Sequence, residues 1–356
     1  MNWGLFRLFL VLLIVTPVTG QNISEPAARN EANPDYKSFR LFEDQDMLKI
    51  TLRFDLSTYT RTKPKKEYLP AIFTIHLSEI DSISRDIRMK TRGIFRNSWC
   101  IYAPIELNFK KVSFGYSDLD SISKLKLVTE CKPGQIYEDY LLKEYLVYKL
   151  FNVLTDSSFR VRLLSINYID SENKRKPMHH YGFFIEPVET LAERMNCVQV
   201  KSPNLTQKSI IPDIMDRMAI FNFMVGNYDW SIPGQHNVKV FKPMSFTQSG
   251  LAIAIPYDFD WTGFVNPGYA LPVEETGLEN VRERLFTGVC RSREVYLKRM
   301  EIFSAKKEEF YSVINEFPYL DQKVKRDVSY YLDGFFDRLG RRNMVVEDIL
   351  NTCKNF

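Results

Sequence analysis

The sequence predicts an α+β protein in which strands fill most of the first half and helices most of the second half. Short runs rich in Ile, Leu and Phe, separated by polar turns, occupy residues 47–130. A long amphipathic pattern follows at 137–155, and apolar residues recur at helical spacing through much of the chain after Pro187. With 356 residues, 45% hydrophobic and 26% charged, the composition is that of an ordinary folded protein rather than a disordered one.

The N-terminal segment predicts export. Residues 1–20 carry one charge, Arg7, followed by the apolar run Leu8 to Val15 and small residues near Gly20. This run is too short to span a bilayer, which needs about 20 residues, so the pattern indicates a cleaved secretory signal peptide, with an uncleaved anchor as the alternative. Residues 21–45 are polar and lack a hydrophobic period, which predicts a flexible arm. We therefore expect a periplasmic, cell-surface or secreted protein with no transmembrane segment after cleavage.

The cysteines and the net charge narrow the class of protein. An exported chain can keep disulfides, and an odd number of cysteines leaves at least one thiol free; the five are Cys100, Cys131, Cys197, Cys290 and Cys353. The most plausible bridge is Cys100–Cys131, because each adjoins an expected strand of one sheet; free buried thiols are the alternative. No CxxC pair occurs, which argues against zinc. A net charge of +4 without long basic runs gives no reason to expect nucleic acid as a partner.

The elements of the first half are expected in this order. Strand-like runs lie at 47–56, 70–80, 84–93, 100–111 and 124–130. A helix at 137–155 has Leu142, Leu146 and Leu150 at intervals of one helical turn. Two further strand-like runs, 159–170 and 179–189, are joined by a polar linker and predict a hairpin. Residues 46–186 are therefore expected to form one domain, a mainly antiparallel sheet with one long helix.

The second half, residues 187–356, is expected to be mainly helical. The helix at 211–225 has Pro212 near its first turn and Gly226 directly after its end, which are common positions for these residues. Two more helices are predicted at 292–316 and 321–339.

One candidate ion pair joins the helix to the strand before it. Glu144 interrupts an apolar face of helix 137–155, where a carboxylate needs a partner. Lys124 and Lys126, two residues apart, share a face of the preceding strand. The functional interpretation is a pair between Glu144 and Lys126 that holds the lysine against phosphate oxygens, with Lys124 as a possible replacement. The alternative is an ordinary surface ion pair.

A second candidate is the turn Arg92-Gly93 with Arg96, between two strand-like runs. Glycine lets backbone N–H groups approach a phosphate, and arginine binds phosphate through two parallel hydrogen bonds. The alternative is a turn with two solvated arginines.

Two polar segments of the second half are candidates for an acid and a metal site. The loop GNYDWSIPGQHN, residues 226–237, places Asp229 and Asn237 after a helix. In the segment PYDFDWTG, Asp258 and Asp260 alternate with aromatic residues and so point to the same side of an extended chain. Paired carboxylates are typical ligands of Mg²⁺ and Mn²⁺. The alternative is a turn with two surface acids.

These candidates follow the order that phosphoryl transfer from a nucleotide requires. Such a site needs a basic or glycine-rich phosphate cover, a lysine, a helix glutamate, an acid beside the nucleophile, and Asn and Asp ligands for a metal. The chain supplies them in the order of a protein kinase, with Glu186 in a hinge segment FFIEP after the hairpin; they are Arg92, Gly93, Arg96, Lys126, Glu144, Glu186, Asp229, Asn237, Asp258 and Asp260.

From about Arg88 to Val265 the arrangement resembles the CotH kinase family, the spore-coat-protein-H-like atypical protein kinases. The matching segments are RGIFR, the strand and charged helix at 124–150, the loop 226–237 and the D-x-D segment 258–260. The resemblance implies a bilobal protein-kinase-like fold, ATP with Mg²⁺ or Mn²⁺, and transfer to Ser or Thr of an exported protein. It implies Asp229 as the catalytic acid, Asn237, Asp258 and Asp260 at the metal, and Lys126 with Glu144 at the phosphates.

The chain departs from the family pattern in the glycine turn, where Ile94 and Phe95 stand at positions that often carry Asn and Ser. The step from Asp229 to Asn237 is also longer than in the usual protein-kinase loop. One alternative is therefore a kinase-like interaction or surface protein with weak or no catalysis. Another is a metal-dependent hydrolase that uses the D-x-D pair and His236.

Overall fold

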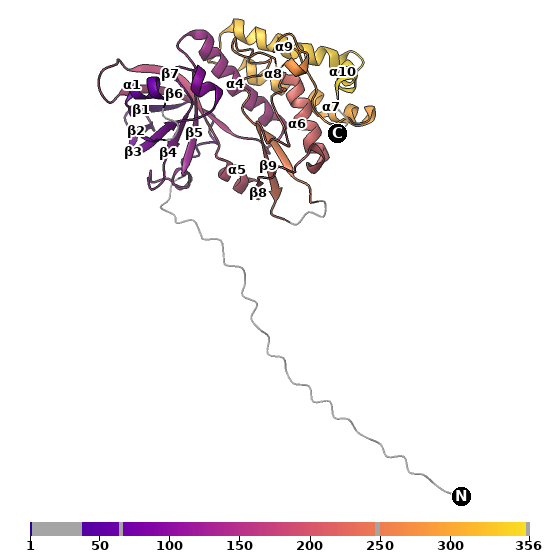
Figure 1. Ribbon diagram of the computed structural model, residues 1–356, viewed down its shortest axis with the longest axis horizontal. Helices are drawn as coiled ribbons and strands as arrows, with labels where there is room; N and C mark the ends of the chain where they lie inside the picture. Colours follow the sequence, from indigo (N-terminus) through magenta and orange to yellow (C-terminus); the bar gives the residue numbers. More distant parts are fainter. Residues whose placement is uncertain (2–37, 64–66, 246–249, 273, 354–356) are drawn as a thin grey trace. The chain divides into compact units, whose positions relative to one another are not determined.

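The computed structural model describes residues 1, 38–63, 67–245, 250–272 and 274–353 (Figure 1). The predicted signal peptide, apart from Met1, and residues 21–37 of the predicted arm lie outside the described residues. Described residues from Ser38 onward belong to one compact unit. Within it, Leu41 and Phe42 are buried in a hydrophobic core, so the last part of the segment expected to be an arm packs against the folded chain.

Seven strands of the first half close into a barrel. Each strand pairs with its neighbours in antiparallel orientation, except that β1 and β6 are parallel. The order around the barrel is β1 (Leu48–Phe54), β2 (Leu69–His76), β3 (Ser82–Thr91), β4 (Ile105–Asn108), β5 (Lys124–Thr129), β7 (Met178–Ile185) and β6 (Val161–Asp170). The predicted hairpin is confirmed as β6 and β7.

The predicted bilobal protein-kinase-like fold is wrong. The α+β class holds, but the first half is a closed mixed barrel rather than an N-terminal lobe built on a mainly antiparallel sheet. The parallel pairing of β1 with β6, from Leu48↔Leu164 to Phe54↔Asp170, joins strands that are far apart in the sequence. Closure leaves neither strand with an unpaired edge, and alternate side chains such as Ile50 and Leu52 fill a core of their own inside.

Helix α4 (Gln135–Leu154) lies between the barrel and the C-terminal helices (Figure 1). It contacts β6 and β7 on one side and α8 (Lys307–Asn315) on the other. Three short helices accompany the barrel strands: α1 (Leu56–Thr62), α2 (Phe95–Trp99) and α3 (Ser117–Asp120). The predicted disulfide Cys100–Cys131 is confirmed. It ties the end of α2 to the connection between β5 and α4.

The second half is helical around a small antiparallel sheet, which the sequence analysis did not predict. The sheet has the order β10 (Ile253–Pro256), β9 (Val238–Pro243) and β8 (Cys197–Val200). The further helices are α5 (Val188–Arg194), α6 (Pro212–Val225), α7 (Arg293–Ala305), α9 (Gln322–Gly340) and α10 (Met344–Thr352), with single 3₁₀ turns at Gln207–Ser209 and Glu274–Thr276. The predicted helix 292–316 is divided into α7 and α8 at Lys306.

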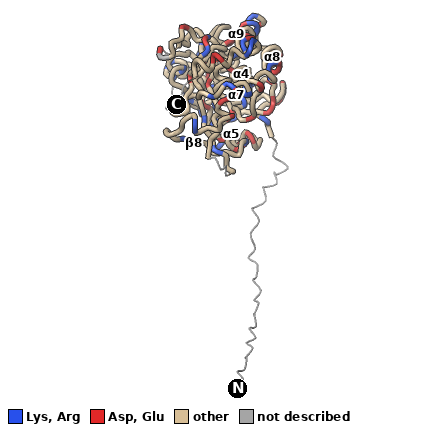
Figure 2. The backbone as a smooth tube through the Cα atoms, turned by 90° about the vertical axis from the view of Figure 1, so that its right-hand side faces the viewer, with Lys and Arg blue, Asp and Glu red and all other residues tan. Residues whose placement is uncertain are grey.

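A second disulfide, Cys290–Cys353, joins the segment before α7 to the end of α10, and Cys197 is a buried free thiol. Basic and acidic residues are interspersed along the described backbone in the view of Figure 2. Among the helices of the described residues, none is both long and apolar enough to cross a bilayer.

Candidate active site

The polar loop 226–237 begins at Gly226, where the loop contacts the segment around Gly263. Gly226 ends α6 in the left-handed conformation, with φ of 67°. A Cβ at Gly226 would lie 2.1 Å from the Tyr331 hydroxyl. The Gly263 N–H donates to the Gly226 carbonyl at 3.0 Å. This close approach places the loop 226–237 beside the D-x-D segment, and only glycine fits both the φ angle and the space.

The loop holds the Asp229 carboxylate in one orientation. His236 Nε2 lies 2.8 Å from Asp229 Oδ1, and Asn237 Nδ2 donates to Asp229 Oδ2 at 3.0 Å and to its carbonyl at 2.8 Å. The Asp229 N–H donates to the side chain of buried Asn227 at 3.1 Å, and Asn227 in turn donates to Asn222 of α6 at 3.0 Å. The side chains of Asp229 and Asn237, both predicted site residues, are therefore in direct contact.

The D-x-D segment directly follows β10. Asp258 has φ of 64°, a conformation that non-glycine residues rarely adopt, and its N–H donates to the Tyr148 hydroxyl of α4 at 2.8 Å. The Tyr269 hydroxyl lies 3.4 Å from Asp260 Oδ2. Burial, and then the negative charge of Asp258, raise the pKa of Asp260 to about 7. Residues in such backbone conformations cluster at functional sites, and here the strained residue is a predicted metal ligand.

The barrel contributes three cationic side chains that face these acids. Arg92 follows β3, Arg96 lies in α2 and Lys126 lies in β5. Burial lowers the pKa of Arg92, and the charge of Asp258 is the largest influence that opposes this. In the described part of the chain, the buried Nε atoms of Arg92 and Arg96 have no hydrogen-bond partner. Two guanidinium groups thus keep an unpaired donor beside the D-x-D segment.

Glu144 pairs with a different partner from the one predicted. Its side chain is 2% exposed and lies 3.2 Å from Arg96, whose second terminal nitrogen donates to the Thr129 carbonyl. Burial raises the pKa of Glu144, and the positive charge of Arg96 is the main influence against it. The predicted pair between Glu144 and Lys126 is absent from the ion pairs of the described residues.

Of the two candidate lysines, Lys126 belongs to the cluster that Arg92 and Arg96 of the barrel half form with Asp258 and Asp260. Lys124 is exposed and lies 3.7 Å from Glu106. The Lys126 ammonium lies 5.5 Å from the centre of the Tyr257 ring. Tyr257 directly precedes Asp258 in the sequence. Burial, and then the neighbouring charge of Arg92, lower the pKa of Lys126 to about 8. Leu125 and Leu127, which alternate with the two lysines along β5, take the opposite face and lie in the barrel core.

Two predicted site residues have other surroundings. Gly93 is exposed, with φ of 85°, and lies in the irregular connection between β3 and α2. Both oxygens of buried Glu186 accept hydrogen bonds from Arg194, at 2.9 and 2.8 Å, and one also accepts from the Arg160 N–H. Glu186 therefore forms a structural ion pair, and in the part of the chain that the structure describes its hydrogen bonds go to Arg160 and Arg194 rather than to the candidate site.

Phe95, one of the two residues that differ from the pattern expected from the resemblance, packs against the segment after Asp260. The Phe95 ring lies 5.2 Å from the Trp261 ring and 5.7 Å from the Tyr269 ring. These contacts fix α2, and with it Arg96, against the segment that carries Asp260.

Two carboxylates could hold a Mg²⁺ or Mn²⁺ ion only together with further ligands, such as water or phosphate oxygens. Among the described residues, no group of three His, Cys, Asp or Glu side chains forms a complete metal site. Mg²⁺ is usually bound by one or two carboxylates together with water and substrate phosphates. The mutual repulsion of Asp258 and Asp260 is the electrostatic environment that a cation relieves. Because Asn237 directs its amide nitrogen to Asp229, its oxygen is the end that could serve as a ligand.

Sequence reasoning missed three aromatic residues of the site. Tyr148 and Tyr269 contact the two D-x-D acids, and the Tyr257 ring lies between Lys126 and Lys239, 5.5 and 4.7 Å from their ammonium groups. Tyr148 lies one helical turn after Glu144, so the helical spacing offered a signal for it. Tyr269 lies in an irregular segment that offered none.

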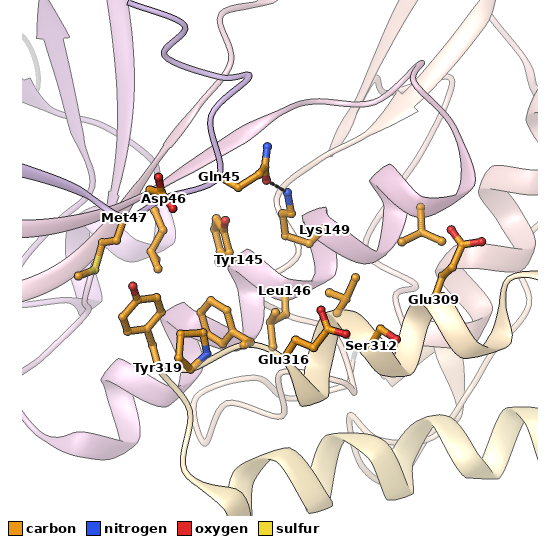
Figure 3. A pocket seen from close by; sticks show the side chains of 15 residues that line it. Gln45, Asp46, Met47, Tyr145, Leu146, Lys149, Glu309, Ser312, Glu316 and Tyr319 are labelled. Carbon is orange, nitrogen blue, oxygen red and sulfur yellow. Dashed lines mark hydrogen bonds between the residues drawn. The ribbon is translucent and has the colours of Figure 1, made fainter.

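A cavity of about 470 Å³ lies on another face of α4 (Figure 3). Tyr145 and Lys149 of α4 line it, together with Glu316 and Tyr319 from the C-terminal part. Glu144 and Tyr148, which face the cluster, do not line it. The helix therefore separates this cavity from the candidate site.

No protein-family model matches this chain, and no curated protein is significantly similar to it.

Proposed function

We propose that the protein is an exported, metal-dependent phosphotransferase that transfers the terminal phosphate of ATP to a Ser or Thr hydroxyl of another exported protein. One observation carries the proposal: Arg92, Arg96 and Lys126 from the barrel half lie in electrostatic contact with Asp258 and Asp260 from the other half. Groups of both signs that are buried or partly buried are costly to assemble, and this set is what a phosphate chain with its cation requires.

The basic side chains suit the phosphate chain. Arg92 and Arg96 have buried Nε donors without partners, and a phosphate oxygen would satisfy them. Lys126, whose pKa is lowered to about 8, is still mostly protonated at pH 7 and gains a partner when a phosphate binds.

The acidic side chains suit the cation. Asp258 and Asp260, with the Asn237 amide oxygen, would hold Mg²⁺ or Mn²⁺. When bound, this ion neutralises charge on the phosphate oxygens and orients them.

Asp229 suits the proton transfer. Its charge influences Asp260, so it lies on the carboxylate side of the cluster. The oxygen of the acceptor hydroxyl forms a bond to the terminal phosphorus, the bond from that phosphorus to the bridging oxygen breaks, and ADP leaves. Asp229 accepts the hydroxyl proton. Hydrogen bonds from Asn237 and the contact with His236 orient its carboxylate for this role.

Two disulfides support the exported part of the proposal, because such bonds persist in oxidising compartments.

Calorimetric titration with ATP, with and without Mg²⁺ or Mn²⁺, tests the nucleotide site. We expect metal-dependent binding that is lost in Asp258→Ala and unchanged in Glu301→Gln, a control on the exposed side of α7. Failure of the wild-type protein to bind ATP with either metal would overturn the proposal.

A second variant separates transfer from binding. Asp229→Asn should still bind ATP while losing metal-dependent turnover, measured as ADP release with a generic protein acceptor such as casein. Binding without turnover in the wild-type protein across acceptors would instead favour the interaction-protein alternative.

A further inference from the structure

A second cavity, of about 570 Å³, lies on the other side of the loop that carries Asp229. Its walls come from the 3₁₀ turn segment 206–208, from Tyr228 and residues 230–233 of the loop, and from Leu285 and Thr287 before α7. Tyr228 and Trp230 line the cavity, whereas the Asp229 side chain contacts His236 and Asn237.

The wall contains several polar atoms that have lost water without gaining a partner. In the described part of the chain, four buried side-chain atoms of lining residues have no hydrogen-bond partner: Trp230 Nε1, Tyr228 Oη, Gln207 Oε1 and Thr287 Oγ1. Trp230 is 7% exposed and Gln207 is 9% exposed. Each such atom costs roughly 1–3 kcal/mol, and folded proteins contain few of them. Four such atoms belong to residues that line one cavity, and this favours a ligand that satisfies them.

The chemistry of the wall specifies the ligand. Gln207 Nε2 donates to the Thr287 carbonyl at 2.9 Å, which fixes the amide and leaves its oxygen as an acceptor that needs a donor. The Trp230 N–H is a donor that needs an acceptor, and the two hydroxyls can serve either purpose. Apolar atoms, including those of Ile232, Pro233 and Leu285, make up most of the wall surface, and the only charged residue among those that line the cavity is exposed Lys208.

We propose that this cavity binds a neutral, planar, mainly aromatic small molecule that carries one amide-like group with both a donor and an acceptor. The volume is in the range of small-molecule sites, about 300–1,000 Å³. The amide N–H would bond to Gln207 Oε1, and the amide oxygen would accept from Trp230 or Tyr228. The ligand would rest on the loop that positions Asp229. The proposal does not depend on phosphoryl transfer, because it concerns a separate cavity and is tested without nucleotide.

Ligand-observed NMR titrations with two probes test the site. The first probe, 2-naphthamide, has a donor and an acceptor; the second, 2-acetylnaphthalene, has the same ring system and an acceptor alone. We expect the amide to bind the wild-type protein several-fold more tightly than the ketone. Absence of saturable binding of the amide up to millimolar concentration would overturn the proposal.

Matched variants locate the site. Leu285→Trp fills the cavity and should weaken binding of 2-naphthamide at least tenfold. Leu271→Trp makes the same change at a side chain that is 71% exposed and does not line the cavity, and it should leave binding unchanged. Equal affinity in the two variants would overturn the assignment.

Gln207→Met keeps the side-chain length and removes the acceptor. If Leu285→Trp does not fold, the Gln207→Met variant tests the proposed binding site in its place. In Gln207→Met the preference for the amide over the ketone should disappear, whereas a preference equal to that of the wild-type protein would contradict the proposed contact.

Discussion

Arg96 of α2 forms a buried ion pair of 3.2 Å with Glu144 of α4, so a short helix of the barrel half is joined by charge to the helix that contacts the C-terminal part. The same guanidinium is influenced by Asp258 and Asp260. The pair therefore links the basic and acidic sides of the candidate active site.

Arg96→Met should destabilise the protein by about 3–5 kcal/mol, because it leaves a buried carboxylate unpaired. Urea unfolding measures the loss. Arg160→Met is the matched control, since Arg160 lies 3.1 Å from Glu43 in a much more exposed pair, and it should cost at most about 1 kcal/mol.

The loss in Arg96→Met should also depend on pH. Arg96 is the main influence that opposes the raised pKa of Glu144, so the variant raises this pKa further. The native state then binds more protons than the unfolded state, and stability falls as pH rises above the ordinary pKa of glutamate. A loss that is independent of pH between 4 and 8 would contradict the buried pair.

Asp260→Asn should stabilise the ligand-free protein while it abolishes metal-dependent ATP binding. The pKa of Asp260 is raised to about 7 from 3.8, so the folded state retains a proton that the unfolded state has lost, and the stability of the wild-type protein falls as pH rises from about 4 to 7. The asparagine removes this cost, which is on the order of 1–4 kcal/mol at pH 7.5. Thermal unfolding at pH 5 and pH 7.5 checks it: the gain should be larger at pH 7.5, and a destabilised variant would refute the expectation.

ATP affinity should weaken as pH rises through about 8, because Lys126 loses its charge there. The folding stability of the ligand-free protein depends on pH with the opposite sign. The lowered pKa means that the unfolded state binds more protons between pH 8 and 10.5, so the contribution of Lys126 to stability rises over that interval. Titrations from pH 6.5 to 9 with the wild-type protein and Lys126→Arg provide the measurement. Arginine keeps its charge, so its profile should be flatter; parallel profiles would exclude Lys126 as the titrating group.

Replacing both Cys290 and Cys353 by serine should lower the free energy of unfolding by about 2–4 kcal/mol. This bond closes a loop with a sequence separation of 63 and secures α10 to the segment before α7. Denaturant unfolding under non-reducing conditions measures the change. Cys197→Ser is the single-thiol comparison, because Cys197 has no disulfide partner; a double variant as stable as the wild-type protein would show that the bond contributes nothing.

Local patterns predicted most of the elements but not their assembly. The long helix at 137–155 appears as Gln135–Leu154, and the helix at 321–339 as Gln322–Gly340, because periodic apolar residues define a helix over its own length. The strands β8, β9 and β10 were missed because they are short, with four to six residues each, and lie in a half whose longer apolar patterns have helical spacing.

The residues of the candidate site could likewise be selected from the sequence, but their partners could not. Sequence order and residue type selected Arg92, Arg96, Lys126, Glu144, Asp229, Asn237, Asp258 and Asp260, and the structure places them in one region. Their partners could not be read from the sequence. Glu144 pairs with Arg96 rather than Lys126, and Glu186 with Arg194, because an ion pair depends on how segments cross in space.

The sequence by itself determined the α+β class, the longer helices, most strands and the residue types of the candidate site, since these follow from short-range periodicity and composition. It favoured the Cys100–Cys131 bond over free thiols, and the structure decided between them. Only the tertiary structure decided that the strands close into a barrel through β1 and β6, that Tyr148 and Tyr269 complete the acidic side, and that unpaired polar atoms surround a cavity behind Asp229. The physical reason is that strand pairing, burial and charge pairing are long-range properties. They depend on which distant segments pack together and exclude water, and a local sequence pattern does not specify those segments.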